Sequence, residues 1–189
     1  MSATLSAIDE RLLRAAIALS AQARAAGNQP YGALLADAQG SVLLEARNTQ
    51  VADRDCTAHA EMNLVRAASS HFGREQLAAC TVYASGEPCP MCAGAIYWGG
   101  VRRLVFGLSI ETMTALGGAD ADELSLHCAD VLAHGTHAVE VLGPALEDEA
   151  RRVLDARSPL TPTLSPEYRG EGAKQASLPP SPARGRGQG

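Results

Sequence analysis

Two short stretches decide how this chain is interpreted: TAHAE at residues 57–61 and EPCPMC at residues 87–92. Between them they supply one imidazole, His59, and two thiols, Cys89 and Cys92. Three donors of this kind are what a catalytic zinc takes from a protein when its fourth position stays open. The sequence therefore predicts a zinc site held by one histidine and two cysteines.

Glu61 adds a carboxylate two residues after His59. By itself, a glutamate in a helix is an ordinary solvated residue. Beside a catalytic metal, a carboxylate can act as a general acid and base, because it can take a proton from water and deliver it to a substrate. The combination favours proton transfer, and we assign that role to Glu61 as a prediction.

The spacing Cys-x-x-Cys has two other interpretations, half of a structural zinc site or a redox pair. A structural zinc would need a further Cys or His at matching spacing, and no other histidine forms a close pair with His59. A redox pair would not need the histidine stretch at all. The other cysteines, Cys56, Cys80 and Cys128, are expected to be small apolar residues, although Cys56 lies only three residues from His59.

The composition indicates one soluble globular domain. The chain has 189 residues, of which 46% are hydrophobic and 20% charged, which is ordinary for such a domain. No apolar run reaches the ~18 residues that a membrane span needs. The odd number of cysteines and the lack of a secretory signal argue against a disulfide framework. We expect a cytoplasmic protein without a membrane partner.

The charge distribution favours a small-molecule substrate. Net charge is −5 for the chain, while residues 1–157 carry 12 Arg, no Lys and 19 acidic residues. An acidic surface without a lysine cluster is a poor match for a nucleic-acid backbone. We therefore expect no nucleic-acid partner.

Hydrophobic periodicity indicates alternating helices and strands. Helices are predicted over residues 6–26, 59–70, 90–98, 122–134 and 144–156, and strands over 31–36, 41–46, 80–85, 103–108 and 138–142, with a polar loop over 48–56 and a loop with a helical segment before residue 122. This order predicts an α/β fold with three layers, α/β/α, around a five-stranded sheet. The two metal-binding stretches begin helices that we expect on one face of that sheet.

The composition changes after Arg157. Residues 158–189 hold six of the ten prolines, five glycines and four serines, with almost no apolar periodicity. We expect residues 1–157 to form the catalytic domain and 158–189 to be a disordered tail. An alternative interpretation is a basic interaction tail, since its net charge is +2.

Residues 57–108 resemble the cytidine deaminase superfamily, closest to its branch of bacterial guanine deaminases and tRNA adenosine deaminases. The motif EPCPMCAGAIYW, residues 87–98, is especially similar to that of guanine deaminases. The resemblance extends more weakly over residues 7–154. It implies zinc-dependent hydrolytic deamination, a five-stranded mixed sheet, a homodimer and a substrate pocket against the zinc.

The resemblance also implies contacts with the substrate. Asn48 stands 11 residues before His59, where the family keeps an Asn that hydrogen-bonds the base, and Tyr31 matches an aromatic position that can stack on the ring. Asp120 stands 28 residues after the last cysteine of the motif, where guanine deaminases place an Asp that reads the base. Here the run is GGAD instead of the family's GFDD, which weakens the assignment of guanine.

Each of these residues has a structural alternative. Asn48 could cap a turn, Tyr31 could be a core aromatic, and Asp120 could cap the following helix. Three more residues within or next to the two motifs are candidates for substrate contact: Ala60, Glu87 and Trp98. For Trp98 the alternative is plain helix packing.

Three functions follow as hypotheses. The first is hydrolytic deamination of a free nucleobase or related heterocycle, with guanine ahead of cytosine, isocytosine and nucleosides. The second is a tRNA adenosine deaminase, which would need a basic surface that residues 1–157 lack. The third is a zinc-stabilised dimeric partner protein without catalysis, against which the intact Glu61 argues.

Overall fold

The computed structural model describes residues 5–117 and 124–155, which form eight helices and five strands. The helices are α1 (Ala7–Ala25), α2 (Gln50–Asp53), α3 (Ala60–His71), α4 (Arg74–Ala78), α5 (Pro90–Gly99), α6 (Ile110–Gly117), α7 (Cys128–Ala133) and α8 (Glu147–Leu154). The strands are β1 (Gly32–Ala36), β2 (Val42–Arg47), β3 (Thr81–Gly86), β4 (Arg103–Leu108) and β5 (Glu140–Leu142). Within this part of the chain, no helix is long and apolar enough to cross a membrane.

The strands form one mixed sheet in the order β2-β1-β3-β4-β5. The hairpin β1–β2 and the pair β1–β3 are antiparallel, whereas β3–β4 and β4–β5 are parallel. Parallel neighbours need a crossover, and α5 lies in the crossover between β3 and β4. The five-stranded mixed sheet is therefore confirmed, and the strand that leads into the EPCPMC motif is central.

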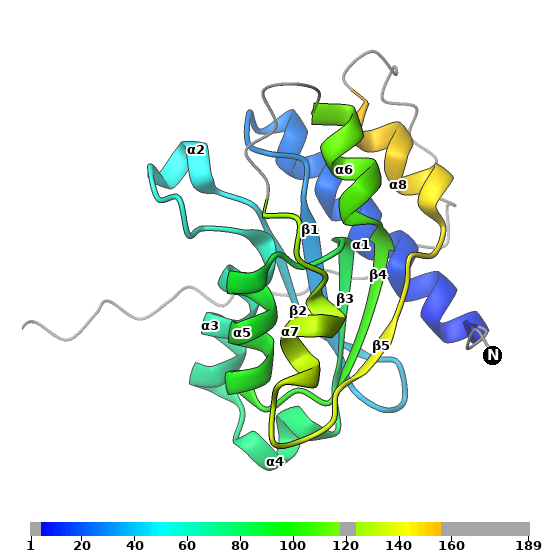
Figure 1. Ribbon diagram of the computed structural model, residues 1–189. Coiled ribbons are helices and arrows are strands. Elements are labelled where there is room, and N and C mark those ends of the chain that lie inside the picture. The colour runs from blue at the N-terminus through cyan, green and yellow to red at the C-terminus, as the bar shows by residue number, and fades with distance from the viewer. Residues whose placement is uncertain (1–4, 118–123, 156–189) are drawn as a thin grey trace, which may run out of the picture.

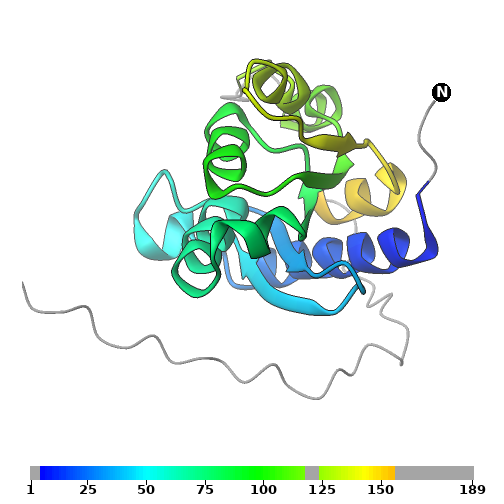
Figure 2. The same ribbon diagram turned by 90° about the horizontal axis from the view of Figure 1, so that it is seen from below.

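Helices cover both faces of the sheet, so the predicted three layers are confirmed (Figures 1 and 2). Alternate residues of the central strands point to opposite faces, as the two-residue period of a strand requires. One face packs Leu35, Val82 and Leu104 against α3, α4, α5 and α7. The other face packs Leu34, Tyr83 and Val105 against α1, α6 and α8. The two metal-binding helices share one face, as predicted, and Figure 1 shows α3 and α5 side by side.

A buried carboxylate fixes α1 to the middle of the sheet. Ser6 caps α1 in a capping box with Asp9, which confirms the predicted helix start. Asp9 also accepts hydrogen bonds from the Arg103 guanidinium at 2.7 and 3.1 Å and from the Tyr83 hydroxyl at 2.7 Å. The first turn of α1 is thereby joined to β3 and β4.

Three local predictions were wrong. The predicted loop after β2 contains the short helix α2, and α4 was not predicted. Of the helix predicted over 122–134, residues 124–127 are not helical and α7 begins at Cys128. Helix α7 starts there because the Glu87 carboxylate, from a distant part of the chain, accepts the Cys128 N–H at 3.0 Å. Local periodicity carries no information about such a contact.

Candidate metal and active site

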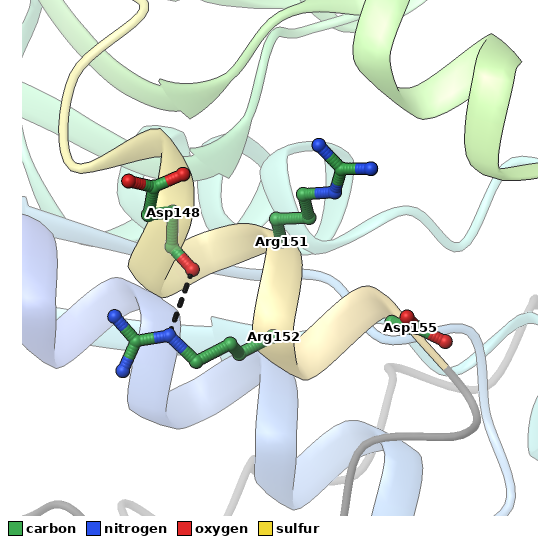
Figure 3. A pocket seen from close by; sticks show the side chains of 4 residues that line it. All are labelled: Asp148, Arg151, Arg152 and Asp155. Carbon is green, nitrogen blue, oxygen red and sulfur yellow. Dashed lines mark hydrogen bonds between the residues drawn. The ribbon is translucent and has the colours of Figure 1, made fainter.

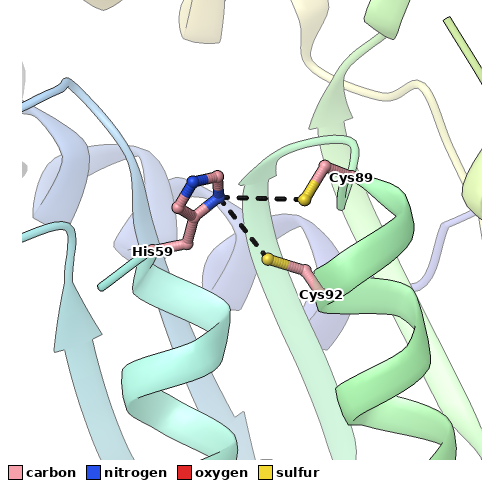
Figure 4. Close-up of side chains that lie close together, drawn as sticks. All are labelled: His59, Cys89 and Cys92. Atoms are coloured by element: carbon pink, nitrogen blue, oxygen red, sulfur yellow. Dashed lines mark hydrogen bonds between the residues drawn. The ribbon is translucent and has the colours of Figure 1, made fainter. Parts of the chain in front are cut away.

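Three predicted metal ligands converge between the starts of α3 and α5 (Figure 4). His59 immediately precedes α3, Cys89 immediately precedes α5, and Cys92 lies in the first turn of α5. The His59 Nδ1 atom lies 3.8 Å from the Cys89 Sγ atom and 3.6 Å from the Cys92 Sγ atom. All three members of this cluster are residues predicted from the sequence as metal ligands.

The donor set fits zinc. All three donor atoms lie within 4.8 Å of one another. For a tetrahedral zinc with a Zn–S bond of ~2.3 Å and a Zn–N bond of ~2.0 Å, the nitrogen–sulfur separation is about 3.5 Å, close to the two distances in the structure. One imidazole and two thiolates leave a fourth position open, which distinguishes a catalytic zinc from a closed structural one.

The helix starts explain why thiolates are stable there. Pro90 is the first residue of α5, where its missing N–H leaves no hydrogen bond unmade. The unpaired N–H groups at the starts of α3 and α5 and the positive ends of their dipoles favour negative charge. Neither His59 nor Cys89 caps its own helix with its side chain, which leaves both side chains available as metal ligands.

The two thiols titrate as a coupled pair. Hydrogen bonding from Cys92 and from His59 lowers the pKa of Cys89 to about 4. The pKa of Cys92 is raised, first by its hydrogen bond to Cys89 and then by burial and the negative charge of Glu61. A divalent cation at this site would be held by both sulfurs as thiolates.

Glu61 lies beside the ligands and is buried. It is the second residue of α3, and its side chain belongs to the small group of buried polar residues. The Cys92 thiol lies 3.6 Å from the Glu61 Oε2 atom. Burial raises the pKa of Glu61 to about 7. A carboxyl group that binds and releases a proton near neutral pH is suited to acid–base chemistry at this position.

Asn48 and Tyr31 lie at the same end of the sheet as the metal ligands. The Asn48 N–H donates to the Tyr31 carbonyl at 3.0 Å, and the following residue donates its N–H to the Ala58 carbonyl at 3.0 Å, next to His59. Asn48 is buried, with 1% of its surface exposed. A Cβ atom on Gly86 would come within 3.3 Å of the Tyr31 ring, so the absence of a side chain lets this ring lie against the end of β3.

Three other predicted residues occupy different surroundings. Ala60 is fully buried as the first residue of α3. Trp98 is 75% exposed on α5, with its ring edge-on to Tyr97 at 5.5 Å between centroids. Asp120 lies outside the described residues. Contact between these side chains and a base stays a prediction.

Glu87 joins the metal-binding motif to two other helices. Its carboxylate accepts the N–H of Ile110 at 3.2 Å, the N–H of Cys128 at 3.0 Å and a hydrogen bond from His127 Nδ1 at 3.2 Å. On its other side, the His127 Nε2 atom lies 3.0 Å from a Glu111 oxygen. The hydrogen bond to Glu87 and the charges of both carboxylates raise the pKa of His127. These contacts fix α6 and α7 beside the loop that carries Cys89, while substrate contact by Glu87 stays a prediction.

Two polar residues that the sequence analysis did not identify organise the loops of the site. The Asn63 amide lies 3.0 Å from the Arg47 carbonyl and 3.0 Å from the Thr49 hydroxyl, and so joins α3 to the end of β2. The Gln50 side chain contacts the Asn48 side chain. Neither residue belongs to a motif, and no sequence signal would have identified it.

A surface hollow on α8 lies apart from this chemistry. It is lined by Asp148, Arg151, Arg152 and Asp155 (Figure 3). Ala150 of α8 packs on the face of the sheet opposite to α3 and α5. The hollow combines both signs of charge on an exposed helix and contains none of the metal donors.

Comparisons with known proteins agree with this geometry. Residues 6–108 match the family model described as the cytidine and deoxycytidylate deaminase zinc-binding region. A protein of Schizosaccharomyces pombe named "Probable cytosine deaminase" is 42% identical over 153 residues, covering 79% of this chain and 93% of that protein. A tRNA-specific adenosine deaminase of Haemophilus influenzae is 38% identical over 112 residues, covering 59% of this chain and 65% of that protein.

The fold is shared with solved structures of deaminases. A guanine deaminase from Nitrosomonas europaea superimposes with a TM-score of 0.66 at 26% sequence identity, covering 82% of this chain and 86% of that one. The likeness extends well beyond the motif residues, because it includes most of both chains.

Proposed function

The chain belongs to the cytidine and deoxycytidylate deaminase zinc-binding family of hydrolytic deaminases, and on that premise we propose that its substrate is a free nucleobase, with guanine as the first candidate. One observation carries the proposal. The Glu61 carboxylate is buried 3.6 Å from a thiol of the His59, Cys89 and Cys92 cluster. A metal donor set with an open position and an adjacent proton carrier is the minimum that hydrolytic deamination requires.

The chemistry divides between the ion and the chain. Zn²⁺ supplies a Lewis acid that makes water nucleophilic at neutral pH. Glu61 takes a proton from the attacking water and donates it to a ring nitrogen of the substrate. It then takes the second proton of that water from the hydroxyl group now on the substrate carbon and donates it to the leaving amine, so that water and an amidine carbon yield a carbonyl group and ammonia. One carboxylate serves both transfers because both occur on the same side of the ring.

The substrate ring would be held from the β1–β2 side of the site. Asn48 offers a buried amide for hydrogen bonds with the base, Tyr31 offers a ring for stacking, and Ala60 is small enough for the base to approach the first turn of α3. A buried amide discriminates strongly between ligands. A ligand that cannot pair with it leaves a polar group that has neither water nor a hydrogen-bond partner. Contacts by Glu87, Trp98 and Asp120 remain part of the proposal without support from the described geometry.

Guanine and cytosine are the two candidates favoured by specific observations. The motif EPCPMCAGAIYW and the likeness to the Nitrosomonas europaea guanine deaminase favour guanine. The 42% identity to the Schizosaccharomyces pombe protein over 93% of its length favours cytosine. The two bases share a ring N–H next to a carbonyl group, so one amide could recognise either.

A transfer RNA substrate is disfavoured by charge. Residues 1–157 have no lysine and carry 19 acidic residues against 12 arginines. Helix α8 begins with Glu147, Asp148 and Glu149. Binding a phosphate backbone depends on clustered cationic side chains that release the counterions of the nucleic acid, and these acidic residues would repel the backbone.

We also propose a homodimer, which a measured mass of twice 19.6 kDa would support.

An ammonia-release screen tests the proposal. Zinc-loaded protein is incubated with guanine, cytosine, isocytosine, adenine, s-triazine amines, nucleosides and an unmodified transfer RNA anticodon stem-loop, with Glu61→Ala as the control. Release from guanine that depends on Glu61 is the expected result. Turnover of another base alone would reject guanine and leave the mechanism standing. No release from any compound would reject the enzyme and leave a zinc-stabilised partner protein.

A further inference from the structure

We propose that Gln50 is a positioning residue that fixes the orientation of the Asn48 amide and thereby selects which edge of a base the site accepts. The inference rests on the proposed function, because it takes Asn48 as a contact of the substrate. It adds a residue of α2 that belongs to neither metal-binding motif. It is carried by hydrogen bonds whose direction the backbone determines.

The Asn48 amide has one possible orientation. The backbone N–H of Gln50 lies 3.0 Å from Asn48 Oδ1. A backbone N–H can only donate, so the atom facing it must be the amide oxygen and not the NH₂ group. The Asn48 Nδ2 atom consequently faces the Gln50 side chain, where it donates to Oε1 at 2.7 Å.

The Gln50 amide is oriented by the same logic. Its Nε2 atom donates to the Cys56 carbonyl at 3.1 Å. A carbonyl can only accept, so the NH₂ group of Gln50 must point to Cys56 and its oxygen must point to Asn48. A backbone donor and a backbone acceptor therefore set both amides, and rotating either one would place like groups against each other.

The chain of contacts ends next to the metal ligands. Cys56 lies in the segment that leads into His59, and Thr49, between Asn48 and Gln50, donates its N–H to Ala58 at 3.0 Å. The loop after β2 and the loop before α3 thus hold each other through main-chain and side-chain bonds. The Gln50 side chain binds the Cys56 carbonyl and the Asn48 amide at the same time, so the position of that carbonyl restrains the Asn48 side chain.

The fixed orientation predicts the edge of the substrate. Oδ1 can accept two hydrogen bonds and Nδ2 can donate two. The contacts with Gln50 use one of each, which leaves one acceptor site on Oδ1 and one donor on Nδ2 for a ligand. A ring edge with a donor next to an acceptor, such as an N–H beside a carbonyl, is complementary to this pair. An edge with two acceptors or two donors is not, because one polar group would then be buried without a partner.

A double-mutant cycle tests whether Gln50 acts through Asn48. The variants are Gln50→Leu, Asn48→Ala and the double variant, assayed as zinc-loaded protein with whichever of guanine or cytosine the wild type deaminates. Gln39→Leu is the matched control, because Gln39 is exposed in the turn at the opposite end of β1. Gln50→Glu is a second variant, since it keeps an acceptor for Asn48 Nδ2. Zinc content and the midpoint of thermal unfolding are measured for every variant.

We expect Gln50→Leu to lower kcat/KM about tenfold, mainly through KM, because an amide that rotates loses binding to substrate and transition state alike. Gln50→Glu should lose less than Gln50→Leu. On the Asn48→Ala background, Gln50→Leu should change kcat/KM by less than about twofold, because the group that it orients is gone. The control should match the wild type, and zinc content should stay constant throughout.

An equal loss from Gln50→Leu with and without Asn48 would overturn the inference, because Gln50 would then act independently. The proposed function would survive that result. If the wild type releases no ammonia from any base, the proposed function fails, and the orientation is decided by NMR. The Asn48 side-chain NH₂ signal should exchange with solvent at least about tenfold faster in Gln50→Leu than in the wild type. Unchanged exchange would overturn the inference on that route.

Discussion

Glu61 is the residue on which the chemistry depends most. Its charge is disfavoured by burial and by the charge of Cys89. It is favoured by a backbone N–H at the start of α3, by His59 and by the hydrogen bond from the Cys92 thiol. The side chain can therefore change protonation state at little cost. His59, Cys89 and Cys92 can bind an ion, but none of them remains to move a proton once they do.

Glu61→Gln should separate metal binding from proton transfer. The amide has nearly the same shape but cannot accept a proton from water, so kcat should fall by about 10²- to 10⁴-fold. Zinc content should remain one ion per chain, because Glu61 is not one of the three donors. The control is Glu75→Gln on α4, an exposed position. A variant that keeps half of the wild-type kcat would refute the assignment of Glu61.

Asp9 shows how a buried ion pair shapes the acid stability of the fold. Burial alone would raise its pKa, but hydrogen bonds from Arg103, Ser6 and Tyr83 hold the pKa of Asp9 well below its ordinary 3.8. Because the pKa is lower in the folded state, this carboxylate stabilises the fold fully above about pH 4. The contribution is lost as pH falls from there through the folded-state pKa.

Asp9→Asn should therefore destabilise the protein near neutral pH by about 2–3 kcal/mol, since Arg103 loses its buried partner and keeps only its ion pair with the exposed Glu140. The free energy of unfolding, measured with urea from pH 7 to pH 3, should differ less between variant and wild type as pH drops below about 4. Asp148→Asn, an exposed aspartate on α8, serves as the control. A difference that stays constant over the whole range would show that Asp9 acts by packing and not by charge.

The metal donors could be predicted from the sequence, but the residues that hold the surrounding loops could not. His59, Cys89 and Cys92 were predictable because a zinc site needs particular donors at short spacings. Gln50 and Asn63 were not, because their roles come from hydrogen bonds across loops that meet only in the folded chain. Nothing in their local sequence differs from that of an ordinary polar surface residue.

Among the elements, the loop between β3 and α5 carries the most constraints. The loop consists of residues 87–89, and both its first residue, Glu87, and its last residue, Cys89, are followed by a proline. The Glu87 carboxylate then binds the first N–H groups of α6 and α7. A single side chain therefore sets where three helices begin relative to one another, and one of those helices holds two of the metal donors.

Glu87→Gln should loosen that junction. The amide keeps one acceptor, but its NH₂ group would face a backbone N–H, so one buried donor loses its partner at a cost of about 1–3 kcal/mol. The Glu87 side chain is 3% exposed, whereas that of Glu111, which also contacts His127, is 65% exposed. Glu111→Gln is thus the matched control and should change the unfolding free energy by less than about 0.5 kcal/mol. Equal losses of unfolding free energy in the two variants would show that Glu87 does not hold α6 and α7 together.

Helix boundaries were predictable where the signal is local. Ser6 with Asp9 marks the start of α1, and Pro90 with Gly100 frames α5, and both helices lie within one residue or two of the expected bounds. The start of α7 was not predictable, because the capping carboxylate comes from residue 87. Local capping residues therefore define a helix end from sequence, whereas a cap from a distant element does not.

For the whole molecule, alternation of strand and helix patterns predicted five strands and three layers. The strand order β2-β1-β3-β4-β5 does not follow from periodicity, because one pattern of buried residues fits several orders. The resemblance to deaminases supplied the mixed character of the sheet. The substrate does not follow from the fold, because it depends on site residues that can differ between proteins with the same fold.

Removal of residues 158–189 should leave the enzyme unchanged. Their composition, rich in proline and glycine without apolar periodicity, predicts no contribution to a packed core. A chain that ends at Arg157 should match the full chain within about twofold in kcat/KM and about 0.5 kcal/mol in unfolding free energy. A larger loss would show that the tail belongs to the catalytic unit.

Ammonia release should depend on zinc bound at His59, Cys89 and Cys92. The protein is stripped of metal with a chelator, assayed for ammonia release over the nucleobase panel, and assayed again after titration with Zn²⁺. We expect no release from the stripped protein and full recovery at one zinc ion per chain, with no recovery in Cys89→Ala. Equal release of ammonia by metal-free and zinc-loaded protein would show that the reaction does not use this metal site.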